Sequence, residues 1–214
     1  MVGNSLIVVG MCLLVWFGYD YYQTKSMQDQ SMVEAQERLF VDLGNNGALD
    51  QSNLTMTNKE EPLSPFLSPS DEYARESFQS IEINQGDAFA ILEIESLDRQ
   101  LPIVEGTNPE ELQRGVGHYR DSVLPGGDEQ ILLSGHRDTV FRDFGELEIG
   151  DLFIVHMEYG SFRYKIEETE IVDADDRTVI REMGEEVLVV TTCYPFDFIN
   201  HAPERFVIYA YPID

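Results

Sequence analysis

From residue 81 to the C-terminus, the sequence is a series of short runs rich in β-branched and aromatic residues. Turn signals such as "PGGD" and "EIGD" separate these runs. Runs of this length between turn signals are typical of a closed β-barrel or a β-sandwich. We therefore predict a mainly β domain over residues 81–214 with seven or eight strands, formed by AFAILEIES, QLPIVEG, QILLSGH, DLFIVHMEY, FRYKIEETEIV, VLVVTTC and RFVIYAY.

One short helix is predicted among these strands, in the segment TNPEELQRG. Thr107 or Asn108 is suited to the N-cap position, and Pro109 is suited to the first helical position because its missing N–H has no partner there. Gly115 is the expected stop signal.

The N-terminal segment LIVVGMCLLVWFGYDYY, residues 6–22, is almost entirely apolar. About 17–20 apolar residues are needed to cross a bilayer, and Trp and Tyr favour its interfaces. We expect residues 1–22 to form an uncleaved, single membrane anchor. A cleaved signal peptide is the alternative, although no small-x-small cleavage site follows the apolar run.

Between the anchor and the β domain, residues 23–80 are polar and contain the breakers "GNNG" and "EEPLSPFLSPS". This composition predicts a flexible linker. A short helix is expected within it near SMVEAQERLFVDL, because the apolar residues there approximate one helical face.

The chain is strongly acidic, with 40 Asp and Glu against 14 Lys and Arg and a formal net charge of −26. Nucleic acids and anionic membrane surfaces attract basic proteins, so we expect no nucleic-acid partner. The acidic surface is explained most simply as a solubilising coat.

The sequence contains two cysteines, Cys12 within the apolar N-terminal segment and Cys193 at the end of a predicted strand. Their positions exclude a disulfide between them, so Cys193 is a free thiol. A buried, inert cysteine is one interpretation. The other is catalysis, because His136 ends another predicted strand and histidine can move a proton to and from a thiol near neutral pH.

Arg205 begins the last predicted strand, shortly after the strand that ends at Cys193. If these two strands pair as an antiparallel hairpin, the sulfur and the guanidinium lie at the same end of the sheet. An arginine at that position can hold a peptide carbonyl or a developing oxyanion.

At these residues the sequence resembles the sortases, the membrane-anchored cysteine transpeptidases of Gram-positive bacteria. SGHRDTVF around His136 is similar to the histidine segment of the family, and VVTTCYPF is similar to its cysteine strand. Arg205 stands where the arginine of the family is expected. LPIVEG and GVGHYRDSVLPGG are similar to segments that precede the histidine strand, so the resemblance spans residues 81–214.

The resemblance implies an eight-stranded sortase β-barrel with one or two short helices, preceded by an N-terminal transmembrane helix and a flexible linker. It implies that Cys193 is the nucleophile, His136 the general acid/base and Arg205 the stabiliser of substrate or oxyanion. Sortases cut a Leu-Pro-x-Thr-Gly-like sorting signal after Thr, form a thioester on the cysteine and pass the protein to an amino group of a peptidoglycan precursor. The expected location is the cell membrane, with one membrane pass and an extracellular catalytic domain.

The subtype most similar to this chain is the class D sortase. Pilus-building sortases also have a long segment before the catalytic domain, often with an Asp-Pro-aromatic lid. The nearest stretch here, Ser64-Pro65-Phe66, lacks the aspartate.

Four further residues are assigned from the sequence. Thr192 and His201 are predicted to contact substrate, although Thr192 can instead bond the backbone. His118 is expected to be structural, and His156 is expected to be an ordinary sheet residue. No cofactor is expected, although some sortases bind calcium near the position of the acidic run at 173–176, which is otherwise a solvated loop.

Three functions remain as alternatives to a cell-wall transpeptidase. The chain can be a pilus-polymerising sortase, an extracellular β-barrel binding module with an inert cysteine, or a thiol peptidase that only hydrolyses. Labelling with a thiol-reactive probe distinguishes the binding module from a sortase, and product analysis with and without an added amine distinguishes the hydrolytic peptidase.

Overall fold

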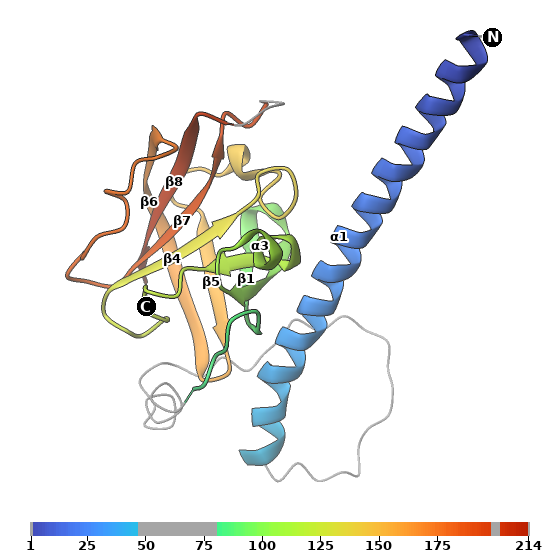
Figure 1. The fold of residues 1–214 in the computed structure, drawn as a ribbon. Coiled ribbons are helices and arrows are strands. Elements are labelled where there is room, and N and C mark those ends of the chain that lie inside the picture. Colours follow the sequence, from blue (N-terminus) through green and yellow to red (C-terminus); the bar gives the residue numbers. More distant parts are fainter. Residues whose placement is uncertain (1, 47–80, 198–201, 214) are drawn as a thin grey trace.

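A computed structural model describes residues 2–46, 81–197 and 202–213 of the chain (Figure 1). Eight strands close into a barrel in the order β1-β2-β3-β4-β7-β8-β6-β5. The predicted mainly β fold is confirmed, and the barrel rather than the sandwich is the form adopted. The strands are β1 Ala88–Ile94, β2 Arg99–Glu105, β3 Val116–His118, β4 Gln130–Gly135, β5 Leu152–Met157, β6 Gly160–Asp173, β7 Val187–Tyr194 and β8 Glu204–Pro212.

Strand β3 is the element that the sequence pattern did not indicate. It has three residues and lies between β2 and β4 in the barrel. It pairs in parallel with β2 and antiparallel with β4. A Cβ atom at Gly117 would lie 2.5 Å from the carbonyl oxygen of Gly106. Glycine is needed there because the backbones approach so closely, and a glycine-containing run of three residues is too short to read as a strand.

The inner face of the barrel holds the main hydrophobic core. Alternate residues of each strand point inward, as expected for a pleated sheet. Phe141 stacks on Phe144 with ring centroids 3.8 Å apart, and Phe144 in turn stacks on Phe153. Phe144 lies in the short 3-10 helix η2, Phe144–Glu146, and a second 3-10 helix, η1, covers Glu95–Leu97.

The predicted short helix is confirmed as α3, Pro109–Arg114, between β2 and β3. Asn108 is its N-cap, and the Asn108 N–H donates to the Glu111 side chain at 2.9 Å. The Gly115 N–H donates to the Glu111 carbonyl at the other end. The bond from Asn108 satisfies a donor at the N-terminus for which the helix has no internal carbonyl partner, and the bond from Gly115 closes the last turn.

The N-terminal helix α1, Val2–Asn46, is longer than the sequence indicated. It continues past the predicted boundary at residue 22, so the first part of the predicted flexible linker is helical, and the rest lies outside the described residues. Figure 1 shows the C-terminal half of α1 beside the barrel, near α3 and β1.

The membrane-spanning helix predicted in residues 1–22 is not confirmed: in the described part of the chain, no helix has the length and apolar content of a membrane span.

A second, smaller hydrophobic cluster lies on the outer face of β4, β7 and β8. The connection between β6 and β7, residues 174–186, packs Val179 and Met183 against it. Glu129, just before β4, anchors this connection: its carboxylate accepts the N–H groups of Met183 at 2.5 Å and Gly184 at 3.1 Å. The bond from Met183, followed by one from the Gln130 N–H at 3.0 Å and that from Gly184, holds the pKa of the Glu129 carboxyl below its ordinary value.

We predict that Glu129→Gln lowers the unfolding midpoint at pH 7, because the amide replaces one acceptor oxygen with a donor. A carboxyl whose pKa is depressed by folding stabilises the fold above its unfolded value, near 4.3, and loses that contribution as the pH falls through the lower folded value. The difference between wild type and variant should therefore shrink below about pH 4. Urea unfolding at pH 7 and pH 3.5 measures it, with the exposed Glu182→Gln as control. A difference that is the same at both values of pH would contradict the assignment.

Candidate active site

The three predicted catalytic residues lie at the ends of neighbouring strands. Strand β7 pairs in parallel with β4, with Gly135 opposite Thr192, and it pairs antiparallel with β8, with Cys193 directly opposite Arg205. His136 follows Gly135 as Cys193 follows Thr192. The hairpin predicted between the cysteine and arginine strands is confirmed, and the parallel pairing brings His136 to the same edge.

Strand alternation also places the three residues on one face of the sheet. Leu132, Val189 and Val207 belong to the outer cluster, whereas their strand neighbours point into the barrel. Moving along β7 and β8 in steps of two leads from Val189 and Val207 to Cys193 and Arg205, and His136 follows directly after the end of β4, two residues beyond Ser134. All three side chains are half-buried, so each remains reachable from solvent.

The outer face is divided into a covered part and an open part. Toward the start of β4 and β7, the connection between β6 and β7 covers the face; the Gln130 side-chain amide donates to the Val179 carbonyl at 2.8 Å, and the Arg181 guanidinium lies 5.7 Å from the Tyr209 ring centroid. Between this cover and the catalytic edge, Ser134 and Thr191 are half-buried neighbours on β4 and β7.

Two side-chain contacts hold the histidine segment against the cysteine strand. The buried Thr192 hydroxyl donates to the Gly135 carbonyl at 2.7 Å, and an Arg137 guanidinium N–H donates to the Pro195 carbonyl. The first contact joins the residues directly before His136 and Cys193. The second joins residues that follow them in the chain. The predicted substrate contact of Thr192 is corrected here: its side chain points inward, and its hydroxyl bonds the backbone.

The turn after His136 is fixed by packing beneath it. The His136 carbonyl accepts the Phe141 N–H at 3.0 Å. A Cβ atom at Gly135 would lie 2.5 Å from the Phe141 ring. The absence of a side chain at Gly135 therefore lets Phe141 close the barrel directly under the residue that precedes the histidine.

The Arg205 guanidinium is oriented by backbone carbonyls. One of its terminal nitrogens donates to the carbonyls of Ala202 at 3.2 Å and Glu204 at 2.8 Å. An arginine has five N–H donors, so donors on the other nitrogens can serve a ligand. This permanent positive charge lies opposite Cys193, where it can stabilise a developing oxyanion.

The other histidines have different surroundings. His118 is buried and lies 2.6 Å from a Glu105 carboxylate oxygen, and its other ring nitrogen lies 3.1 Å from the Val123 carbonyl. Burial and these contacts agree with the predicted structural role. His156 lies on β5 between Ser161 at 2.8 Å and Glu93 at 3.0 Å, as expected of a sheet residue. The predicted substrate residue His201 lies outside the described residues.

Sequence analysis did not identify Arg137 as part of the site. The signal available was a basic residue directly after the histidine in "GHRDTVF", but its partner, the Pro195 carbonyl, carries no side-chain signature.

In the acidic run 173–176, an Asp176 carboxylate oxygen accepts the Thr178 N–H at 2.7 Å, which lowers the Asp176 pKa. Within the described residues, no group of three or more His, Cys, Asp or Glu side chains is placed to hold a metal ion.

Comparisons with known proteins point to one family. A family model described as "Sortase domain" matches residues 92–213. Sortase D of Bacillus subtilis (strain 168) is 38% identical over 205 residues, which cover 95% of this chain and 93% of that protein. The catalytic domain of B. anthracis SrtD is 38% identical, with a TM-score of 0.54 over 63% of this chain and 93% of that one. Clostridium perfringens sortase C, solved with the C-terminal cell wall sorting motif, is 28% identical, with a TM-score of 0.56 over 67% of this chain and 84% of that one.

We predict that Thr192→Val lowers the free energy of unfolding by roughly 1 kcal/mol, the usual net contribution of one hydrogen bond. Valine keeps the shape and β-branching of threonine but cannot donate to the Gly135 carbonyl. Urea denaturation measures the change. Thr191→Val is the matched control on the outer face, expected to stay within about 0.5 kcal/mol of wild type. Equal effects of the two substitutions would show that the Thr192 hydrogen bond does not stabilise the strand pair.

Proposed function

Because the chain belongs to the sortase family of cysteine transpeptidases, we propose that it cleaves a Leu-Pro-x-Thr-Gly-like sorting signal after Thr and transfers the protein to an amino group of a peptidoglycan precursor. The observation that carries the proposal is the meeting of His136, Cys193 and Arg205 on one face at one barrel edge. The similarity to Sortase D, and the sorting motif in the C. perfringens sortase C structure, support the substrate class.

In the proposed first step, the Cys193 thiolate attacks the carbonyl carbon of the substrate Thr. The protonated His136 imidazole gives its proton to the leaving nitrogen as the C–N bond breaks, which leaves a thioester on Cys193. In the second step an amine attacks the thioester carbonyl and gives a proton to His136. The C–S bond breaks, and Cys193 leaves as a thiolate.

Arg205 has an electrostatic role in both steps. Each attack converts a neutral carbonyl oxygen into an oxyanion, and a guanidinium already held in place stabilises that charge without reorganisation. The contacts to the Ala202 and Glu204 carbonyls supply this orientation before substrate binds.

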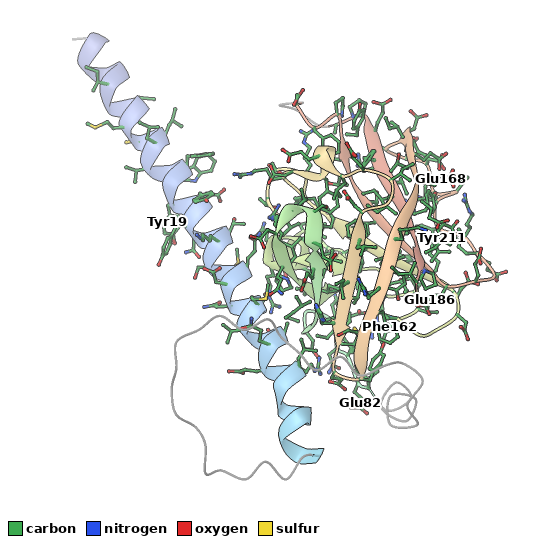
Figure 2. The ribbon with its side chains drawn as sticks, turned by 180° about the vertical axis from the view of Figure 1, so that it is seen from behind. Tyr19, Glu82, Phe162, Glu168, Glu186 and Tyr211 are labelled. Atoms are coloured by element: carbon green, nitrogen blue, oxygen red, sulfur yellow. The ribbon has the colours of Figure 1, made fainter. Side chains whose placement is uncertain are left out.

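We further propose that the chain is bound to the cell membrane by a single N-terminal pass, with the catalytic barrel outside the cell. Large apolar side chains from Ile7 to Tyr22 are exposed on α1, and Trp16, Tyr19 and Tyr22 are residue types that favour the bilayer interface. Figure 2 shows Tyr19 pointing away from the barrel. Fractionation of cells, with protease treatment of intact protoplasts, tests both location and orientation.

We predict that Cys193→Ala abolishes cleavage of Leu-Pro-x-Thr-Gly and Leu-Pro-x-Thr-Ala peptides, because no other described side chain at this edge is a thiol. Mass analysis of the products, with and without an added amine, measures cleavage and transfer together. A variant that keeps more than a few per cent of the rate would refute the cysteine mechanism. A wild-type enzyme that ignores the amine would support the hydrolytic peptidase, and one that leaves every peptide intact would support the binding module.

We predict that His136→Ala and Arg205→Ala each lower kcat/KM by about a hundredfold or more, as expected for loss of acid/base and oxyanion functions. The barrel should remain folded, because both side chains are only half-buried. His156→Gln, at a histidine on β5, is the control and should change the rate less than about threefold at equal thermal stability. A larger loss in His156→Gln than in His136→Ala would show that the base is wrongly assigned.

A further inference from the structure

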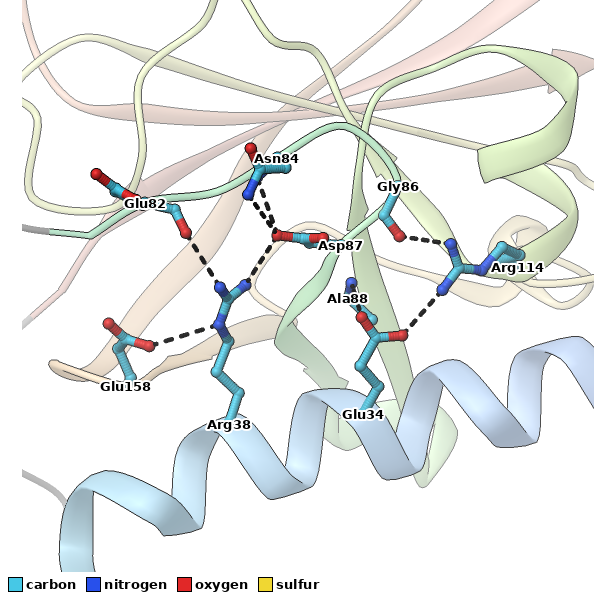
Figure 3. A network of polar contacts seen from close by, with 9 residues as sticks. All are labelled: Glu34, Arg38, Glu82, Asn84, Gly86, Asp87, Ala88, Arg114 and Glu158. Carbon is cyan, nitrogen blue, oxygen red and sulfur yellow. Dashed lines mark hydrogen bonds and ion pairs between the residues drawn. The ribbon is translucent and has the colours of Figure 1, made fainter. Parts of the chain in front are cut away.

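The C-terminal half of α1 is attached to the barrel by two sets of polar contacts (Figure 3). In the first set, Arg38 donates to the Glu82 carbonyl at 3.0 Å, and its guanidinium lies 3.7 Å from the Asp87 carboxylate and 3.8 Å from the Glu158 carboxylate. A single helix residue thereby contacts three separate positions of the barrel domain.

In the second set, Glu34 lies between α3 and β1. One Glu34 oxygen pairs with the Arg114 guanidinium at 2.9 Å, and the other accepts the Ala88 N–H at 3.1 Å. Arg114 also donates to the Gly86 carbonyl at 2.5 Å and to the Ser31 hydroxyl at 3.3 Å. Because Glu34 bonds a backbone N–H as well as a side chain, it determines how α1 is placed along β1.

Small residues let the helix approach the barrel closely between these contacts. Ser31 and Ala35 are fully buried, one helical turn apart on the same face. Ala35 packs against Ala88, Ile91 and Val104 on the outer side of β1 and β2, and Met32 and Leu39 border this cluster. The docked half of α1 is therefore held by an apolar contact as well as by charge.

The N-terminal half of α1 has the opposite character, because the apolar side chains described there are exposed on all sides. Consecutive residues from Leu13 to Phe17 are all more than half exposed, so no single stripe is available to pack into a protein groove. A lipid bilayer is the partner that accepts a helix apolar all round, and aromatic residues concentrate at the end nearer the barrel. The exposed side chains are Ile7, Val9, Met11, Leu13, Leu14, Val15, Trp16, Phe17, Tyr19, Tyr21 and Tyr22.

The part of α1 between the last exposed aromatic residue, Tyr22, and the first docked residue, Ser31, is short. From Tyr22 to Ser31, a continuous helix rises about 14 Å at 1.5 Å per residue. In Figure 1, β8 descends from the upper end of the barrel to the C-terminus, so its first residues, which carry the arginine of the site, lie at the same end as the N-terminus of α1.

We propose that α1 is a rigid arm between the bilayer and the barrel, and that Glu34 and Arg38 clamp it so that the catalytic edge faces the membrane at a fixed, short distance. This inference rests on the proposed function, because a substrate held in the same membrane presents its sorting signal close to the lipid surface. The clamp affects where the site is held and leaves the chemistry at Cys193 unchanged.

The test uses the full chain in vesicles of phosphatidylglycerol and phosphatidylethanolamine. Two substrates carry the same sorting signal, one as a free soluble peptide and one attached through its C-terminal side to a transmembrane peptide in the same vesicles. The double variant Glu34→Ala with Arg38→Ala removes the clamp, and Ala35→Arg disrupts docking by a second route. Glu37→Ala, at an exposed position on the same helix, is the matched control.

Both docking variants should cleave the bilayer-linked substrate at least about fivefold more slowly than wild type while cleaving the soluble peptide within about twofold of its rate, and the control should match wild type. Amide exchange in residues 31–39 should be faster in the variants. The proposal is overturned if the bilayer-linked rate is unchanged, if both rates fall together, if exchange does not increase, or if wild-type protein does not sediment with the vesicles. A wild-type chain that cleaves neither substrate refutes the proposed function instead.

Discussion

The parallel pairing of β4 with β7 is the constraint on which the candidate site depends. It sets Gly135 opposite Thr192 and thereby brings the end of the histidine segment to the level of the cysteine, while the antiparallel pairing with β8 brings Arg205 opposite Cys193. A shift of one residue in either pairing would turn one of these side chains into the core, because successive strand residues face opposite sides. The inner core residues of the three strands therefore hold the register of the catalytic edge.

Local contacts refine what the register places. The Thr192 hydroxyl and the Arg137 guanidinium each donate to a backbone carbonyl of the other segment, so the relative height of His136 and Cys193 is fixed from both sides. The guanidinium of Arg205 is likewise held by carbonyls of its own strand start. The donors are side chains and the acceptors are backbone atoms, which makes the arrangement depend on the path of the chain more than on the identity of the acceptor residue.

The N-terminal helix extends the catalytic unit beyond the barrel. Its docked half combines a small apolar contact at Ala35 with ionic contacts at Glu34 and Arg38, and none of these interactions is strong alone. Together they hold a helix whose other half exposes apolar side chains. The barrel, the docked part of α1 and its exposed apolar segment therefore form one continuous structural unit.

Local patterns in the sequence determined the β class, α3 with its cap, and the strand ends at which Cys193 and Arg205 lie, because alternation, capping and turn signals act over a few residues. The hairpin between β7 and β8 was also predictable, since its strands are adjacent in the chain. The tertiary structure alone decided that β3 exists, that β4 lies beside β7, that Thr192 points inward and that α1 docks on β1. Each of these depends on partners distant in sequence. Ser31 and the Pro195 carbonyl carry no pattern of their own, and their roles arise only where packing brings another part of the chain within contact.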